Sequence, residues 1–327
     1  MSRDNKSRAL PGSRSSGDVY IGISGWRYKG WRGVFYPEKL PQRRELEFAA
    51  QRFNTIELNG SFYSLQRPES FSQWAAATPP GFKFSVKGSR YLTHMLRLRG
   101  IESPLANFFA QGLLRLGPKL GPILWQFPAN FKFEPGRLDA FLSMLPKSHR
   151  EAAELARLHD HRLDERCWFD VEEDAPLRYA MEIRDRSFVC EEFISLLRRH
   201  RVALVAADTV EWPLLMDITA DFIYCRLHGS EELYASGYRP EELEIWSRRV
   251  AAWSQGGEVH DGERASARSA PRRRHRDVFV YFDNDAKVHA PFDAEKLQEL
   301  VADRLSRGSA ALAKPGADDR KGEVPQC

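Results

Sequence analysis

The chain lacks the features that assign many proteins to a class at once. Its four cysteines, at 167, 190, 225 and 327, show no CxxC spacing and no nearby histidine partner, which favours free thiols in a reducing cytosol. No stretch approaches the ~20 apolar residues of a transmembrane helix. The opening MSRDNKSRALPGSRSSGD has no apolar core of the kind found in secretory signals. These absences predict a cytoplasmic protein without a membrane partner.

Other absences narrow the chemistry. Gly22–Ile23–Ser24–Gly25 is not followed by a dinucleotide-binding fingerprint, which argues against a Rossmann fold, and no nucleophile motif is apparent. The formal net charge is only +4, from 49 basic and 45 acidic side chains. Composition therefore neither requires nor excludes a nucleic-acid partner. No internal repeat and no low-complexity tract stands out.

What the chain does contain is eight short runs with the composition of β-strands. The segments between them are long enough for helices, and this alternation predicts parallel β-α-β units. Eight such units close a (β/α)8 barrel, or TIM barrel, and a chain of 327 residues with 42% hydrophobic composition fits one such α/β domain. The runs are Val19–Ser24, Thr55–Asn59, Phe82–Lys87, Pro122–Gln126, Tyr179–Arg184, Val202–Asp208, Phe222–His228 and Val278–Asp283.

The barrel is expected to span residues 18–305, between a disordered N-terminal segment (1–17) and a disordered tail (306–327). Two insertions, at about 147–178 and 256–277, precede the fifth and eighth strands, which predicts that both lie on the bottom face. The second has no apolar periodicity and is expected to be mobile and dispensable for folding. Its basic run, Arg264–Arg276, is either a solvated loop or a surface for an acidic or nucleic-acid partner.

Polar and apolar side chains alternate within the strand runs. Because successive side chains point to opposite faces, the apolar phase is expected to pack on helices and the polar phase to point into the barrel mouth. The C-terminal mouth is where barrels build active sites. Unpaired buried charges cost several kcal/mol, so we expect solvated strand ends, an internal salt-bridge network or a functional site. The inward residues are predicted to be Glu57, Asn59, Lys87, Gln126, Glu182, Arg184, Asp208, Arg226, His228 and Asp283.

Four of these residues form a possible metal site, with one from the end of each of the last four strand runs. Three carboxylates and one imidazole suit Mg²⁺ or Mn²⁺, and Zn²⁺ less well. The competing interpretation is charge pairing, of Glu182 with Arg184 or Arg226 and of Asp208 with Lys87, and the many cations at the same strand ends favour it. The four candidate ligands are Glu182, Asp208, His228 and Asp283.

The same strand ends also predict anion recognition. A guanidinium fork matches phosphate or carboxylate geometry, and aromatic rings can stack on a sugar or base, although loop aromatics as often anchor a loop in the core. Acid–base catalysis is assigned to Glu57, His94 or His228, because imidazole titrates near neutrality and burial raises a carboxyl toward it. The expected substrate contacts are Asn59, Lys87, Arg90, Gln126, Arg184, Arg226, Trp26 and Tyr63.

Several motifs, spread over about Tyr20–Leu305, occur together in one known family. They are YIGISGW, FNTIELNGSFY, FKFSVKGSRYLTH, GPILWQFPANF, EIR, FIYCRLHG and FDND. In these motifs the chain resembles the YecE-like proteins, also called domain of unknown function 72. The resemblance implies a TIM barrel and no assigned activity. Asp185 and Phe188 stand where that family commonly has His and Trp, and Asp283 stands where it usually has Asn, which adds a potential anionic ligand.

The leading functional hypothesis is an enzyme for a small anionic or sugar-like substrate, phosphorylated or polyhydroxylated. It would act by hydrolysis or by proton-transfer isomerisation at the barrel mouth. The alternatives are a nucleic-acid-associated protein, whose binding would depend steeply on salt, and a barrel that binds a ligand without catalysis.

Overall fold

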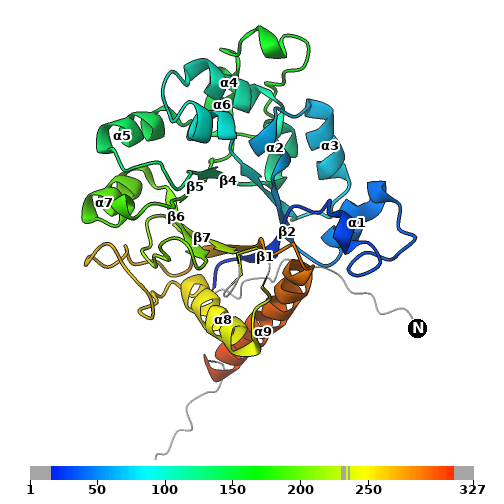
Figure 1. Ribbon diagram of the computed structural model, residues 1–327, viewed down its shortest axis with the longest axis vertical. Helices are drawn as coiled ribbons and strands as arrows, with labels where there is room; N and C mark the ends of the chain where they lie inside the picture. The colour runs from blue at the N-terminus through cyan, green and yellow to red at the C-terminus, as the bar shows by residue number, and fades with distance from the viewer. Residues whose placement is uncertain (1–15, 230–232, 235, 313–327) are drawn as a thin grey trace, which may run out of the picture.

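The computed structural model describes residues 16–229, 233–234 and 236–312. Its strands form one closed, all-parallel barrel in chain order, with β1 hydrogen-bonded to β8 (Figure 1). The predicted (β/α)8 fold is confirmed, and each strand run was placed to within a few residues. The strands are β1 (Val19–Ser24), β2 (Thr55–Leu58), β3 (Lys83–Lys87), β4 (Leu120–Gln126), β5 (Tyr179–Glu182), β6 (Ala203–Asp208), β7 (Phe222–Leu227) and β8 (Asp277–Phe282).

Helices surround the barrel. Proline at the first helical turn begins α3, α5 and α8, where its missing N–H costs nothing. The α-helices are α1 (Glu45–Ala50), α2 (Gly60–Tyr63), α3 (Pro68–Ala76), α4 (Glu102–Ala110), α5 (Pro135–Met144), α6 (His149–Ala156), α7 (Glu191–His200), α8 (Pro240–Ser254) and α9 (His289–Leu312). The short helices are η1 (Lys29–Trp31), η2 (Gln42–Arg44), η3 (Tyr91–Met95), η4 (Leu113–Lys119), η5 (His161–Leu163) and η6 (Arg186–Phe188).

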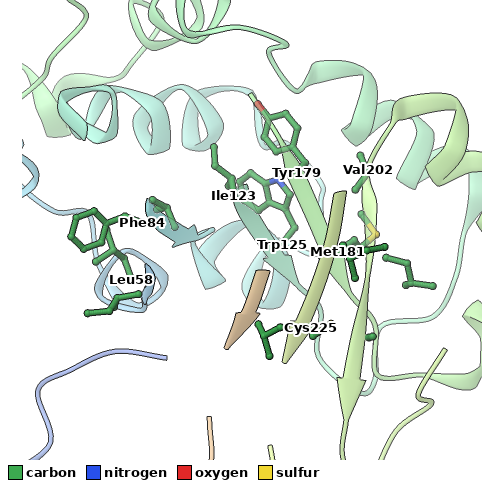
Figure 2. Packing of buried hydrophobic residues seen from close by; sticks show 14 of the residues in the cluster. Leu58, Phe84, Ile123, Trp125, Tyr179, Met181, Val202 and Cys225 are labelled. Atoms are coloured by element: carbon green, nitrogen blue, oxygen red, sulfur yellow. The ribbon is translucent and has the colours of Figure 1, made fainter. Parts of the chain in front are cut away.

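Strand alternation sorts the buried apolar side chains into two separate clusters. The larger one lies between strands and helices and includes Leu58, Phe84 and Met181 (Figure 2). The smaller one fills the barrel interior with residues of the other phase, among them Tyr224 and Tyr281, whose rings are 5.1 Å apart. The predicted division into a helix-facing and an inward-facing phase is therefore confirmed. The interior cluster forms an apolar floor beneath the mouth.

The connection from β6 to β7 departs from the alternation of strand and helix. Residues 209–221, all of which are described, contain no helix. The insertion 256–277 packs beside this connection instead: Met216 N–H donates to the carbonyl of Glu263 (2.9 Å), and Asp217 accepts from Ala265 and Ser266 N–H (2.7 and 3.0 Å). The same insertion contacts α7 through Arg198, which donates to the Arg268 carbonyl (3.0 Å), and α8 through the Arg249–Asp261 ion pair (3.0 Å).

The insertion therefore packs along the β6–β7 connection, while its mobility and its dispensability for folding stay predictions. Arg276, only 2% exposed, joins its two ends by donating to the carbonyls of Gly256 (2.7 Å), Gly257 (3.2 Å) and Pro271 (2.7 Å). Backbone and side-chain hydrogen bonds thus contact the segment although it lacks apolar periodicity.

The insertion 147–178, the two ends of the chain and the cysteines were also subjects of prediction. The insertion 147–178 packs through α6 and its following turn on α4, where Asn107 accepts from Asp160 N–H (3.0 Å). Helix α9 continues to Leu312, past the predicted domain end at 305. Residues 1–15 and 313–327, which include most of both predicted disordered segments and Cys327, lie outside the described residues. The other three cysteines are free thiols. Among the described helices, none is long and apolar enough to cross a bilayer.

Candidate functional site

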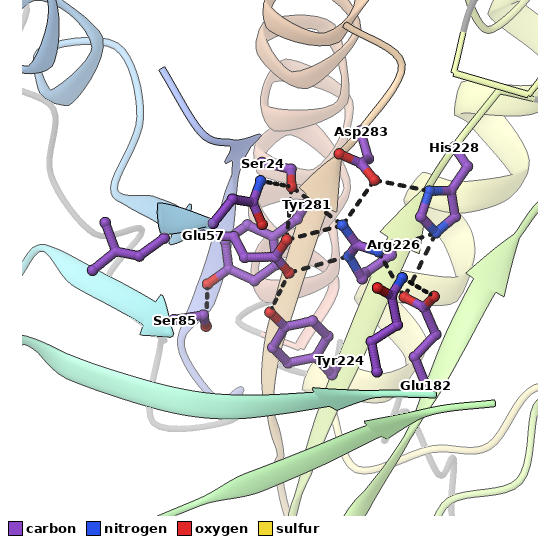
Figure 3. Close-up of polar contacts among 12 residues, drawn as sticks. Ser24, Glu57, Ser85, Glu182, Tyr224, Arg226, His228, Tyr281 and Asp283 are labelled. Carbon is purple, nitrogen blue, oxygen red and sulfur yellow. Dashed lines mark hydrogen bonds and ion pairs between the residues drawn. The ribbon is translucent and has the colours of Figure 1, made fainter. Parts of the chain in front are cut away.

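A buried guanidinium occupies the centre of the C-terminal mouth (Figure 3). Arg226, the penultimate residue of β7, is 0% exposed and donates to Glu57 (2.9 and 3.1 Å), Glu182 (2.7 Å) and Asp283 (2.8 Å). These carboxylates come from β2, β5 and the residue after β8. Burial alone would lower the pKa of Arg226, but the three carboxylates outweigh it and hold the pKa well above its usual value. The mouth is thus built around a cation with full anionic pairing.

Glu57 is held from every side. The hydroxyls of Ser24 (2.6 Å) and Tyr224 (2.7 Å) donate to its two oxygens, in addition to Arg226. Asn59, a predicted substrate contact, donates instead to the Ser24 hydroxyl (2.9 Å). Glu57 was predicted as a catalytic base, but its oxygens are occupied and the side chain is fully buried. Its position is that of a scaffold for Arg226.

His228 is enclosed at the back of the same network. Its Nδ1 lies 3.1 Å from Asp283 Oδ2 without hydrogen-bond geometry, and its Nε2 lies 3.7 Å from Glu182 Oε2. The ring packs edge-on against Trp212 and Tyr234, with centroids 5.5 and 5.4 Å away. An imidazole that is 0% exposed and surrounded in this way is not open to the mouth.

Glu182 links the network to the rim of the mouth. Its Oε1 accepts from Gln126 (2.7 Å) and from Arg184 Nε (3.0 Å). The prediction was pairing of Glu182 with Arg184 or Arg226, and the structure shows ion pairs with both. Burial alone would raise the pKa of Glu182, but Arg226 and Arg184 outweigh it and hold the pKa well below the usual range. The Arg184 guanidinium stacks over the Trp212 ring at 4.0 Å.

Asp208 does not belong to this site, which corrects the sequence prediction. It shares the phase of Leu204 and Ala206, which face the helix layer, and it accepts a hydrogen bond from Trp246 Nε1 of α8 (2.8 Å). Its predicted pairing with Lys87 is wrong for the same reason. The four predicted metal ligands therefore do not lie together. Within the described part of the chain, no three His, Cys, Asp or Glu side chains are arranged to hold a metal ion.

At the side of the mouth formed by β3, the buried charge is not paired as Arg226 is. Lys87 ends β3, points inward with Ser85, and is 8% exposed. Among the residues that the structure describes, its ammonium has neither a hydrogen bond nor an ion pair; its charge lies over the face of Phe62, 4.4 Å from the ring centroid. Burial, together with the nearby charge of Arg226, lowers the pKa of Lys87 to about 8.

Further cationic and aromatic groups extend from Lys87 along the rim. His94 packs edge-on against Phe62 at 5.2 Å, and its Nδ1 is 2.8 Å from the Thr93 hydroxyl. Burial, followed by the charges of Arg184, Lys87 and Arg90, lowers the pKa of His94 to about 4. Its imidazole is therefore neutral near pH 7.

The predicted aromatic contacts divide into two kinds. Tyr63 is 65% exposed beside the rim, with the Arg90 guanidinium 5.4 Å from its ring centroid. Trp26 is only 7% exposed and packs edge-on against Trp74 at 5.7 Å, as a core residue that anchors its loop. Tyr63 is therefore available to a ligand, whereas Trp26 anchors its loop in the core.

Some residues of the site were not predicted. Ser24 and Tyr224 lie in the inward phase of β1 and β7, so alternation alone identifies them. Tyr234, whose hydroxyl accepts from Arg184 (3.3 Å), comes from a loop without any periodic signal. Asp285 follows β8, and burial together with the charge of Asp283 raises its pKa to about 6.

Comparison with known proteins places the chain among relatives without an assigned activity. A family model described as protein of unknown function DUF72 matches residues 20–316. UPF0759 protein YecE of Escherichia coli K12 is 25% identical over 244 residues, covering 72% of this chain and 82% of that protein. UPF0759 protein YunF of Bacillus subtilis 168 is 30% identical over 118 residues, covering 35% of this chain and 41% of that protein.

Solved structures show the same architecture. The crystal structure of a DUF72 family protein from Thermotoga maritima is 26% identical, with a TM-score of 0.64 over 86% of this chain and 98% of that chain. A DUF72 family protein from Enterococcus faecalis, 16% identical, has a TM-score of 0.59 over 86% of this chain and 95% of that chain, which shows the fold alone.

Proposed function

The chain belongs to the family of proteins of unknown function DUF72, and we propose that it is an enzyme for a small phosphorylated or polyhydroxylated molecule. The substrate would bind at the C-terminal mouth of the barrel. The observation that carries the proposal is the buried ammonium of Lys87, which makes no hydrogen bond or ion pair among the described residues, although the charges of Glu57, Asp283 and Glu182 act on its pKa. A buried charge without a partner costs stability, and an anionic ligand would offset that cost.

The anionic group would bind between Lys87, Arg90 and Arg184. Lys87 lies over the Phe62 ring (4.4 Å) and Arg90 over the adjacent Tyr63 ring (5.4 Å), with the two ring centroids 5.0 Å apart, and the charge of Arg184 acts with theirs on His94. Arg90 is exposed and Arg184 is partly exposed, and guanidinium groups match phosphate and carboxylate geometry. Gln126, bound to Glu182, would contribute an amide at the edge of this subsite. Tyr63 supports the proposal as an exposed ring for a sugar face.

Proton transfer would be carried out by His94 and Lys87 rather than by Glu57 or His228. A neutral imidazole at the rim can accept a proton, and an ammonium with a pKa near 8 can donate one close to neutrality. Glu57 and His228 are fully buried and engaged with Arg226 and Asp283. We assign these two residues to the scaffold that holds the mouth in shape.

Phosphate binding tests the proposal. Inorganic phosphate and a series of sugar phosphates are titrated into the protein by calorimetry, with the melting temperature as a second readout. We expect binding by the wild type and loss of binding in Lys87→Met. Lys83→Met is the matched control, because Lys83 lies on the same strand and phase but its ammonium donates to the Pro118 carbonyl (2.6 Å) at the other end. Absence of any phosphate or sugar-phosphate binding would overturn the proposal.

A second candidate, nucleic-acid association, is favoured by a separate observation. Arg272, Arg273 and Arg274 are all exposed on the insertion that forms the barrel wall. Three adjacent exposed guanidinium groups suit a row of phosphates. Oligonucleotide binding that weakens steeply with salt, and that is lost when the three arginines are replaced by alanine, would support this candidate. Binding that is unchanged by that replacement would dismiss it.

A further inference from the structure

Building on the proposed function, we infer that Lys87 is a nucleophile that forms an imine with an aldehyde or ketone group of the substrate. The substrate class is thereby narrowed to carbonyl compounds that also carry a phosphate or several hydroxyl groups. Lysine is suited to this step when its amine is held in a desolvated site beside another cation.

Neighbouring residues hold the backbone around Lys87 in place. Ser61 Oγ donates to the Lys87 carbonyl (2.6 Å), and the next residue, Gly88, passes so close to Trp125 that an added Cβ would lie 2.2 Å from that ring. The preceding inward residue, Ser85, is tied to the Tyr281 hydroxyl in the barrel floor (2.6 Å). The backbone at Lys87 is therefore held on three sides, and its side chain rises from the floor into the mouth. Reactive groups need such support from neighbouring residues.

The surroundings of the amine differ from those of two partly buried lysines, Lys83 and Lys119. Lys119 donates to the carbonyls of Ala75 and Thr78 (2.6 Å each), and Lys83 donates to that of Pro118 (2.6 Å). Carbonyl acceptors hold an ammonium in place and occupy its protons. Within the described residues Lys87 has no such acceptor, and only the ring face of Phe62 lies against its charge. Its nitrogen is thus the one among these three whose protons no described carbonyl oxygen accepts.

The step balances without any further reagent. The Lys87 nitrogen forms a bond to the carbonyl carbon as the C=O bond breaks, and the oxygen leaves as water. Counted from the ammonium form, two protons leave with that oxygen and the third stays on the iminium nitrogen, so neither an oxidant nor a reductant is needed. His94, neutral near pH 7 and in contact with the same Phe62 ring, is placed to move a proton between nitrogen and oxygen.

This chemistry favours one of the two reaction types. An iminium withdraws electrons from the neighbouring carbon and makes its C–H bond more acidic, which assists proton transfer and not phosphate hydrolysis. The Arg226 network has no role in bond formation here. Burial and the charge of Arg226 disfavour the ammonium form of Lys87, whereas the carboxylates of Glu57, Asp283 and Glu182 favour it.

Reductive trapping tests the inference on the full chain. The protein is incubated with dihydroxyacetone phosphate or with dihydroxyacetone, then treated with sodium borohydride, and the modified residues are mapped by mass spectrometry. We expect one adduct, at Lys87, at least about tenfold above any other lysine, because the neutral amine fraction rises about tenfold per unit of lowered pKa. The adduct is expected to be absent from Lys87→Arg and Lys87→Met and retained in Lys83→Arg.

The outcomes separate this inference from the proposed function. Equal labelling of surface lysines, or no labelling of Lys87 in a protein that still binds inorganic phosphate, would overturn the imine and leave the anion site standing. No labelling together with no phosphate binding would overturn both. Circular dichroism of each variant checks folding, and two different replacements at Lys87 keep the test valid if one of them misfolds.

Discussion

Arg226 and Lys87 are both buried cations at the ends of barrel strands, yet their surroundings are opposite. Arg226 is surrounded by Glu57, Glu182 and Asp283, whereas Lys87 has no ion pair among the described residues and lies over the Phe62 ring. A cation that is fully paired is costly to remove, because its partners become buried charges without compensation. A cation without a partner lowers stability and is retained where it serves a ligand. One side of the mouth is therefore scaffold, and the other is where we place binding.

The largest expected effect is on the scaffold side. Arg226→Met is expected to lower the free energy of unfolding by ~3–5 kcal/mol, because three buried carboxylates lose their shared cation. Urea unfolding followed by circular dichroism measures it. Arg90→Met is the control, since Arg90 is exposed and is expected to change stability by no more than about 0.5 kcal/mol.

Acid pH tests the same pairing by protonating the carboxylates. The pKa values of Glu182 and Asp283 are held below their ordinary 4.5 and 3.8, mainly because Arg226 outweighs burial. The stabilisation they provide is therefore present above those ordinary values and is lost as pH falls below them. In Arg226→Met this loss at acid pH should shrink. A change of less than about 1 kcal/mol in Arg226→Met at neutral pH would mean that the scaffold interpretation is wrong.

Arg276 is a third buried cation, and its partners are neutral carbonyl groups. It donates to three carbonyls at the base of the insertion and to no carboxylate among the described residues. Arg276→Met is expected to cost about 1–3 kcal/mol, less than Arg226→Met, since it leaves carbonyls and not charges without partners. The melting temperature measures it, with Arg273→Met, an exposed neighbour, as control. Equal effects of Arg276→Met and Arg273→Met would support the prediction that the insertion is dispensable for folding.

The difference between the two sides of the mouth was only partly predictable from sequence. Period-two alternation placed Glu57, Lys87 and Arg226 in the inward phase, because that period follows directly from strand geometry. The same rule, applied to Val202–Asp208, puts Asp208 in the helix-facing phase with Leu204 and Ala206, so its predicted place in the site was wrong.

The ion pairs between side chains of different strand ends could not all be predicted from the sequence. Barrel closure decides which strand ends face each other across the mouth, and Glu57 on β2 meets Arg226 on β7 although those strands are not neighbours. The sequence around Glu57 or Arg226 does not indicate that the two side chains are close in space. For the same reason the absence of a partner at Lys87 becomes visible only once the barrel is closed.

A smaller effect, of opposite sign, is expected on the binding side. Lys87→Met is expected to leave stability unchanged or to raise it by about 1–2 kcal/mol, because a desolvated charge is replaced by an apolar side chain of similar length. Lys83→Met should instead lower stability slightly, since it removes a hydrogen bond to the Pro118 carbonyl. Urea unfolding of both variants decides the matter. Destabilisation of Lys87→Met by more than about 2 kcal/mol would place Lys87 in the scaffold.

The smallest effect tests the charge on Lys87 directly. Its pKa is lowered from 10.5 to about 8 in the folded protein, chiefly by burial, so between these values the unfolded chain binds more protons than the folded one. Stability relative to Lys87→Met should therefore rise with pH through this window, as the cost of burying the ammonium is released. From pH 7 to pH 9 the gain is expected to be about 1 kcal/mol. Over the same window, phosphate binding should weaken, because the anion loses a charged partner. Unfolding curves of the wild type and Lys87→Met at each pH measure the first quantity, and calorimetry measures the second. A parallel pH dependence of the two proteins would mean that Lys87 keeps its proton throughout, and that the amine has a partner after all.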